Sequence, residues 1–157
     1  MSEVRIPAET EALATAVVNA AFAVHRSLGP GLLERAYQEC LAIELSLAGF
    51  RLQREQSLPL TYRGQIVPNA YRLDFIVNDQ LLVELKAIDA VQPIHRVQVT
   101  TYLRLLKLPL GLLINFNVPL IKEGISRVLN LDFRSDRGVS EPLLPPSPNL
   151  ASSRLHA

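Results

Sequence analysis

The strongest constraint on the fold is a pair of apolar segments, residues 71–77 and 81–88, that a three-residue polar turn separates. The stretch reads YRLDFIVNDQLLVELKAI and is rich in branched and aromatic residues on both sides of NDQ. Such runs flanking a turn predict two antiparallel β-strands. Three charged residues nevertheless stand inside these strands: Asp74, Glu84 and Lys86.

Side-chain parity places the three charges together. Alternate side chains of a strand point to the same face, so Glu84 and Lys86 share one face. A three-residue turn pairs Val77 with Leu81, and the same register puts Asp74 directly opposite Glu84. Like charges at opposed positions, with Cβ atoms about 4.5–5.5 Å apart, are destabilising unless a proton, a hydrogen-bond network or a cation compensates them. A two-residue turn would instead put the two carboxylates on opposite faces.

A divalent cation is one compensation that these residue types favour. Mg²⁺ takes oxygen ligands, commonly one or two carboxylates together with waters and substrate phosphates. Lys86, one step along the same face, can hold a water or a phosphate oxygen. The competing interpretation is structural, because edge strands and the solvent faces of hairpins commonly carry charged side chains. The hairpin alone leaves both interpretations open.

The chain up to about residue 130 has the pattern of one α/β or α+β domain. Apolar residues at helical spacing predict helices at 9–27, 32–48 and 93–107. Strands are predicted at 50–58 and 65–67, around a turn at 62–64, and at 111–116, a continuous apolar run of the kind that is covered on both faces. A last amphipathic helix is predicted from Ile121, Ile125, Val128 and Leu129.

Composition and the ends of the chain narrow the class further. The single cysteine, Cys40, permits no internal disulfide, fits a cytoplasmic setting and is expected to pack in the core. The net charge of +1 is weak for a protein that holds duplex nucleic acid by electrostatics alone. We expect no membrane span and no signal peptide. The Pro/Ser-rich tail, residues 131–157, lacks periodicity and is expected to be disordered and dispensable for folding.

The hairpin also resembles the D…(D/E)xK signature of the PD-(D/E)XK nuclease superfamily, since nine residues separate Asp74 from the run Glu84-Leu85-Lys86. The segment GLLERAY (31–37) matches the motif of the small GxxExxY family, which is assigned to that superfamily. Similarity covers about residues 15–130. The resemblance implies an α/β fold with a restriction-endonuclease-like αβββαβ core, a mixed sheet of about four or five strands flanked by helices, for the domain 1–130.

Further site residues follow from the resemblance. Glu34 would add an acidic group to the metal site, although a glutamate in the first turn of any helix is favoured by the helix dipole. Tyr37, one turn later, is expected to pack or to orient Glu34. Gln98 and Tyr102 resemble the QxxxY element of RecB-type nucleases, in which the glutamine supports the site; the structural alternative is two half-buried helix residues. His95 could shuttle a proton or contact a phosphate.

Two classes of function follow. The first is a nuclease in which Mg²⁺ or Mn²⁺, held by Asp74, Glu84, Glu34 and the Leu85 carbonyl, assists phosphodiester hydrolysis while Lys86 acts on water or phosphate. Nucleic acid is the implied partner, DNA more than RNA, and nothing sets the oligomeric state. The second class is a non-catalytic nucleic-acid or protein-binding module that keeps the fold. The sequence contains no P-loop, dinucleotide fingerprint, GxSxG elbow or zinc-ligand spacing.

Overall fold

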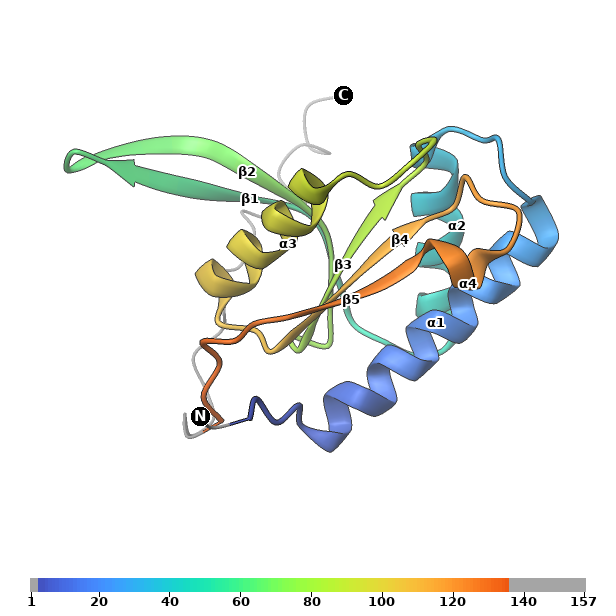
Figure 1. Cartoon of the computed structure of the whole chain (residues 1–157), viewed down its shortest axis with the longest axis horizontal. Coiled ribbons are helices and arrows are strands. Elements are labelled where there is room, and N and C mark those ends of the chain that lie inside the picture. Colours follow the sequence, from blue (N-terminus) through green and yellow to red (C-terminus); the bar gives the residue numbers. More distant parts are fainter. Residues whose placement is uncertain (1–2, 136–157) are drawn as a thin grey trace, which may run out of the picture.

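The computed structural model describes residues 3–135, which form one five-stranded sheet with helices on both faces (Figure 1). The strands lie in the order β1-β2-β3-β4-β5; β3 and β4 are parallel, and the other neighbours are antiparallel. This architecture confirms the predicted α/β class with a mixed sheet. In chain order the elements are α1 (Ala8–Leu28), α2 (Glu34–Leu47), β1 (Leu52–Tyr62), β2 (Gln65–Val77), β3 (Leu81–Lys86), α3 (Pro93–Leu106), β4 (Leu110–Asn115), α4 (Ile121–Gly124) and β5 (Ile125–Leu129).

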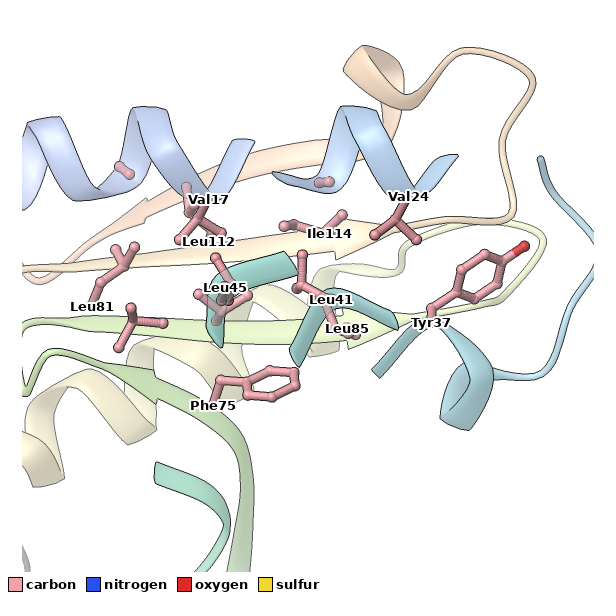
Figure 2. Close-up of a cluster of buried hydrophobic side chains, with 14 of the residues drawn as sticks. Val17, Val24, Tyr37, Leu41, Leu45, Phe75, Leu81, Leu85, Leu112 and Ile114 are labelled. Atoms are coloured by element: carbon pink, nitrogen blue, oxygen red, sulfur yellow. The ribbon is translucent and has the colours of Figure 1, made fainter. Parts of the chain in front are cut away.

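One face of the sheet packs against α1 and α2. Alternate residues of β3 and β4 point to this side, and Figure 2 shows Ile114 beside Val24 of α1 and Leu85 beside Leu41 of α2. The side chain of Cys40 packs against the same core, as predicted. Burial of this apolar area is the main force that holds both helices on the sheet.

The opposite face packs against α3. Val99 and Leu103 of the helix lie in one buried cluster with Leu82 of β3 and Leu113 of β4. The two central strands are therefore covered on both sides, which explains why their sequences read as nearly continuous apolar runs. Because β3 is the middle strand of five, any charged side chain in it is held inside the protein rather than at an edge.

The first two strands form a ribbon that is longer than predicted and that projects from the body (Figure 1). Strand β2 is continuous over Gln65–Val77, where the sequence predicted two separate pieces. Its side chains change sides at Asp74: Phe75 belongs to the core under α1 and α2, whereas Leu73 belongs to the cluster under α3. The β1–β2 register passes from Arg54↔Phe75 to Gln56↔Leu73 without pairing Asp74, and Glu55, the residue skipped on β1, has a φ of 51° that breaks the regular strand conformation. Strand β2 therefore bends away from the sheet at Asp74.

The predicted last helix is wrong. Only Ile121–Gly124 is helical, and Ile125–Leu129 pairs antiparallel with β4 as the fifth strand. The apolar spacing fitted a helix, but pairing with the free edge of β4 satisfies a row of backbone groups that would otherwise be exposed. Gly124 permits the change of direction, because a Cβ there would collide with the carbonyl oxygen of Asn115.

Two expectations concern the remainder of the chain. Within residues 3–135, no helix combines the length and the apolar character needed to cross a membrane. The expectations for the tail fall almost entirely on residues 136–157, which lie outside the described residues.

We expect Gly124→Ala to lower the free energy of unfolding by about 1–3 kcal/mol, because the added methyl group must displace backbone. Lys122→Ala is the matched control, since Lys122 is exposed in the same short helix and its replacement should change stability by less than about 0.5 kcal/mol. Urea unfolding of both variants measures the difference. Equal stability of the two would contradict the close backbone approach that sends the chain into β5.

Candidate functional site

The candidate site lies at the fork where β2 leaves β3. The ladder runs from Val77↔Leu81 to Phe75↔Val83, the register that a three-residue turn predicts. The next step in that register brings Asp74 opposite Glu84. At this position side-chain carboxyl groups accept the hydrogen bonds of the backbone. The Asp74 N–H donates to Glu84 Oε1 at 3.0 Å, and the Leu85 N–H donates to Asp74 Oδ2 at 2.8 Å. The two carboxyl groups thus complete the backbone hydrogen bonding of a sheet that opens at this point.

Glu84 is only 6% exposed and stands in the central strand, so the structural interpretation by edge-strand charges does not apply to it. Burial raises the pKa of Glu84 well above its ordinary value, and the negative charge of Asp74 raises it further. Burial also raises the pKa of Asp74, although the hydrogen bond from Leu85 opposes the shift. Burial therefore disfavours the charged form of both carboxyl groups.

Helix α2 brings a third acidic residue and an amide to the fork. Glu34 is the first residue of the helix, and Gln38 lies one turn later on the same side. Gln38 Nε2 donates to Asp74 Oδ1 at 3.0 Å and to Glu34 Oε1 at 3.4 Å, so one amide group links the two carboxylates. Burial, followed by the charge of Asp74, raises the pKa of Glu34. The sequence analysis missed Gln38, although its i+4 spacing from Glu34 was the signal that could have found it.

Tyr37 supports this end of α2. Its hydroxyl donates to the Gly29 carbonyl at 2.6 Å and accepts from the Leu32 N–H at 3.2 Å, and its ring stacks on Phe116 with centroids 4.6 Å apart. Figure 2 shows the ring at the edge of the core, with its oxygen directed toward the loop that precedes α2. The side chain is fully buried, which fits the packing role that the sequence favoured.

A hollow of about 480 Å³ lies beside α3, and its lining includes Lys86, Gln98 and Tyr102. Burial and then the charge of Glu84 raise the pKa of Tyr102, and a hydrogen bond with Gln98 opposes the shift. His95 also lines the hollow, and its Nδ1 accepts the Gln92 N–H at 2.8 Å in the capping box of α3. One ring nitrogen of His95 is thus engaged in capping the N-terminus of the helix.

Asn115 is a second residue that the sequence analysis missed. It pairs with Lys86 across the parallel strands and is buried. Its Oδ1 accepts the Ile88 N–H at 3.1 Å, and its Nδ2 donates to the Ile88 carbonyl at 2.9 Å. The amide therefore fixes the chain just after Lys86. An asparagine at the end of an apolar strand was the only signal for this role.

Asp74, Glu84 and Glu34 lie near one another at the fork but do not form a compact cluster. Among residues 3–135, no three His, Cys, Asp or Glu side chains converge closely enough to hold a metal ion. Asp74 and Glu84 meet directly, whereas Glu34 reaches Asp74 through the Gln38 amide. The pair nevertheless offers the hard oxygen donors that Mg²⁺ prefers. Burial is the main cause of the raised pKa of each acid, because it disfavours a carboxylate that no cation balances.

Comparison with known proteins gives one match. A family model described as the PD-(D/E)XK nuclease superfamily matches residues 11–128, which include every element from α1 to β4 that builds the fork. No curated protein and no solved structure matches the chain.

We expect the metal-free protein to lose stability as the pH rises. The folded-state pKa of Glu84 lies above its ordinary value of 4.5, so between these two values the folded state binds more protons than the unfolded state. The free energy of unfolding then falls with increasing pH across that window, and the contribution is fully present below it. Urea unfolding in EDTA at a series of pH values measures the slope.

Glu84→Gln is the control for this pH dependence, because the amide does not titrate. Glu11 and Glu39 have pKa values lowered by arginine partners and contribute the opposite slope in both proteins. The difference between wild type and variant therefore isolates the acid pair. Identical slopes would show that the pKa of Glu84 is not raised.

A second prediction concerns Gln38. Gln38→Ala should lower the free energy of unfolding of the metal-free protein by about 1 kcal/mol, because Asp74 loses a hydrogen bond in a partly buried position. Ser46→Ala, at an exposed position of the same helix, is the control. Thermal unfolding in EDTA measures both, and a variant as stable as the control would mean that the amide link contributes nothing.

Proposed function

The chain belongs to the PD-(D/E)XK nuclease superfamily, and from this membership we propose that it is a metal-dependent nuclease that hydrolyses phosphodiester bonds, in DNA more than in RNA. The observation that carries the proposal is the buried Asp74–Glu84 pair at the fork, with Lys86 on the same side as Glu84. The motif of Gly31, Glu34 and Tyr37 leads us to place the chain in the GxxExxY group of that superfamily.

Mg²⁺ or Mn²⁺ is the ion that fits this donor set. Asp74, Glu84 and the Leu85 carbonyl would hold it, and Glu34 would approach from α2. When bound at such carboxylates, an ion of this kind polarises a phosphate and lowers the pKa of a water molecule. Raised pKa values of three neighbouring acids support the assignment, because burial disfavours their charged forms and a bound cation would favour them.

The residues of the chain itself would orient the reactants and stabilise charge. The Lys86 ammonium lies in the hollow beside α3, where it can hold a phosphate oxygen or a water and stabilise the negative charge that develops during hydrolysis. Gln98, hydrogen-bonded to Tyr102, can support a bound phosphodiester from the same hollow. Asn115 keeps Lys86 in position by fixing the chain that follows it.

A non-catalytic module that binds nucleic acid or protein is the second candidate function. The observation in its favour is that no three acidic or imidazole groups among residues 3–135 already form a compact ion site. Against it stands the burial of Glu84, because a carboxyl group in a central strand is costly and a binding surface has no chemical need for it.

Glu84→Gln and Lys86→Ala should separate these functions. Glu84→Gln should weaken Mn²⁺ binding and abolish cleavage, and should stabilise the metal-free fold by about 0.2–1 kcal/mol because it removes a like-charge pair. Lys86→Ala should leave Mn²⁺ binding unchanged and reduce turnover, because lysine acts on water and phosphate rather than on the ion. Calorimetric Mn²⁺ titration and cleavage of labelled single- and double-stranded DNA and RNA, with and without Mn²⁺, give the readouts. Wild-type protein that neither binds Mn²⁺ nor cleaves any of these substrates would refute the nuclease.

A further inference from the structure

The hollow that Lys86, Gln98 and Tyr102 line is called the catalytic hollow below, after the proposed function. A second hollow, of about 520 Å³, lies between α3 and β5. Both hollows are lined by Val97 and Thr101, so they border each other across this exposed part of α3. In Figure 1, α3 lies over the sheet with β2 beyond one flank and β5 beyond the other. A ligand that extends out of the catalytic hollow over α3 therefore arrives in the second one.

Three arginines line this second hollow: Arg96, Arg104 and Arg127. The hydroxyls of Thr100 and Thr101 lie beside them. Arginine binds phosphate through two parallel N–H donors, and threonine hydroxyls are common phosphate partners in nucleic-acid complexes. The chain has a net charge of only +1, so three guanidinium groups around one hollow are a marked local concentration of positive charge.

The arginines are held in place without being neutralised as a group. Arg127 forms two bonds with Glu11, at 2.9 and 2.7 Å, and Arg104 Nε contacts Asp132 at 3.0 Å. Arg96 donates to the backbone carbonyl of Arg127 at 3.2 Å and has no carboxylate partner within residues 3–135. Exposed ion pairs contribute only about 0–1 kcal/mol, so a phosphate can compete for these guanidinium groups.

We propose that the hollow between α3 and β5 binds the phosphate backbone of a nucleic-acid strand that extends from the catalytic hollow across α3. This inference rests on the proposed nuclease function, because that function places the scissile phosphate beside Lys86. A helix with its side chains is about 10–12 Å across, and phosphates of one B-form strand lie about 3.4 Å apart along the axis. The arginines thus contact phosphates about three nucleotides from the site of cleavage.

Removal of two arginines tests the proposal. Arg96→Gln/Arg104→Gln should bind labelled oligonucleotides about tenfold more weakly, because two solvent-exposed charge contacts are lost. The dependence of log K on log salt concentration should become shallower by about 1.4 for a single strand, at about 0.7 for each phosphate contact. Fluorescence anisotropy in EDTA measures binding without cleavage, and separate single- and double-stranded probes show which form of the backbone the hollow prefers.

The matched control is Arg5→Gln/Arg26→Gln, which changes the net charge equally at two exposed positions outside both hollows. Glu11→Gln/Asp132→Asn supplies a test of opposite sign, because it frees Arg127 and Arg104 and should tighten binding. If the control and Arg96→Gln/Arg104→Gln weaken oligonucleotide binding equally, the proposal is overturned. Unchanged or weaker binding after removal of the two acids would overturn it as well. A polyglutamate that binds as tightly as an oligonucleotide would assign the hollow to an acidic protein segment and overturn it too.

Hydrolysis of bis(4-nitrophenyl) phosphate in Mn²⁺ distinguishes this proposal from the nuclease itself. This small phosphodiester cannot span α3, so Arg96→Gln/Arg104→Gln should hydrolyse it at the wild-type rate and lose cleavage only with longer oligonucleotides. Glu84→Gln should behave conversely, with hydrolysis lost and oligonucleotide binding in EDTA retained. Arginine-dependent binding by a wild-type protein without hydrolysis would refute the nuclease alone, and hydrolysis without arginine-dependent binding would refute the hollow alone.

Discussion

The structure depends on two hydrogen bonds in which carboxyl groups replace strand pairing: Asp74 N–H to Glu84 Oε1, and Leu85 N–H to Asp74 Oδ2. Where two strands separate, each leaves backbone donors that would otherwise be buried without partners. The facing acids satisfy these donors from both sides, so β2 can bend away from β3 at Asp74 without losing backbone hydrogen bonds. The projecting ribbon, the access of α2 to the fork and the hollow under α3 all follow from that separation.

The same two groups are poorly suited to be neighbours, and this conflict is what makes the fork a candidate site. Burial raises the pKa of both carboxyl groups, and the charge of Asp74 raises that of Glu84 further, so a proton or a cation would stabilise the pair. Gln38 relieves part of the conflict with its amide, which donates to Asp74 and Glu34 where a cation would otherwise balance them. If the proposed metal binds here, the site trades stability of the empty fold for affinity toward a positive ion, as functional sites commonly do.

The sequence could predict whatever depended on local pattern. Strand parity and a three-residue turn were sufficient to oppose Asp74 and Glu84, and helical spacing located α1, α2 and α3 to within a few residues. Pairing between segments distant in the sequence could not be predicted. Residues 125–129 have the spacing of a helix, and the sequence does not show that the free edge of β4 lies beside them. Gln38 and Asn115 were missed because the partners that define their roles, Asp74 and Ile88, lie 36 and 27 residues away, and the local signals, an i+4 spacing and an asparagine at a strand end, are common ones.

Charge gives the remaining step. A net charge of +1 is too small for a protein that binds nucleic acid through its overall electrostatic field, so the positions of the individual charged side chains matter more than their total. The buried acids of the fork concentrate negative charge where a cation can bind, while Lys86 and the arginines beside α3 and β5 concentrate positive charge along one path across the helix. Fields between such groups act over about a Debye length, roughly 8–10 Å at physiological salt, so each neighbourhood acts independently of the total. A nearly neutral chain can therefore carry the proposed cation site and the proposed phosphate-binding hollow at once, because the first is built from acids of β2, β3 and α2 and the second from arginines of α3 and β5.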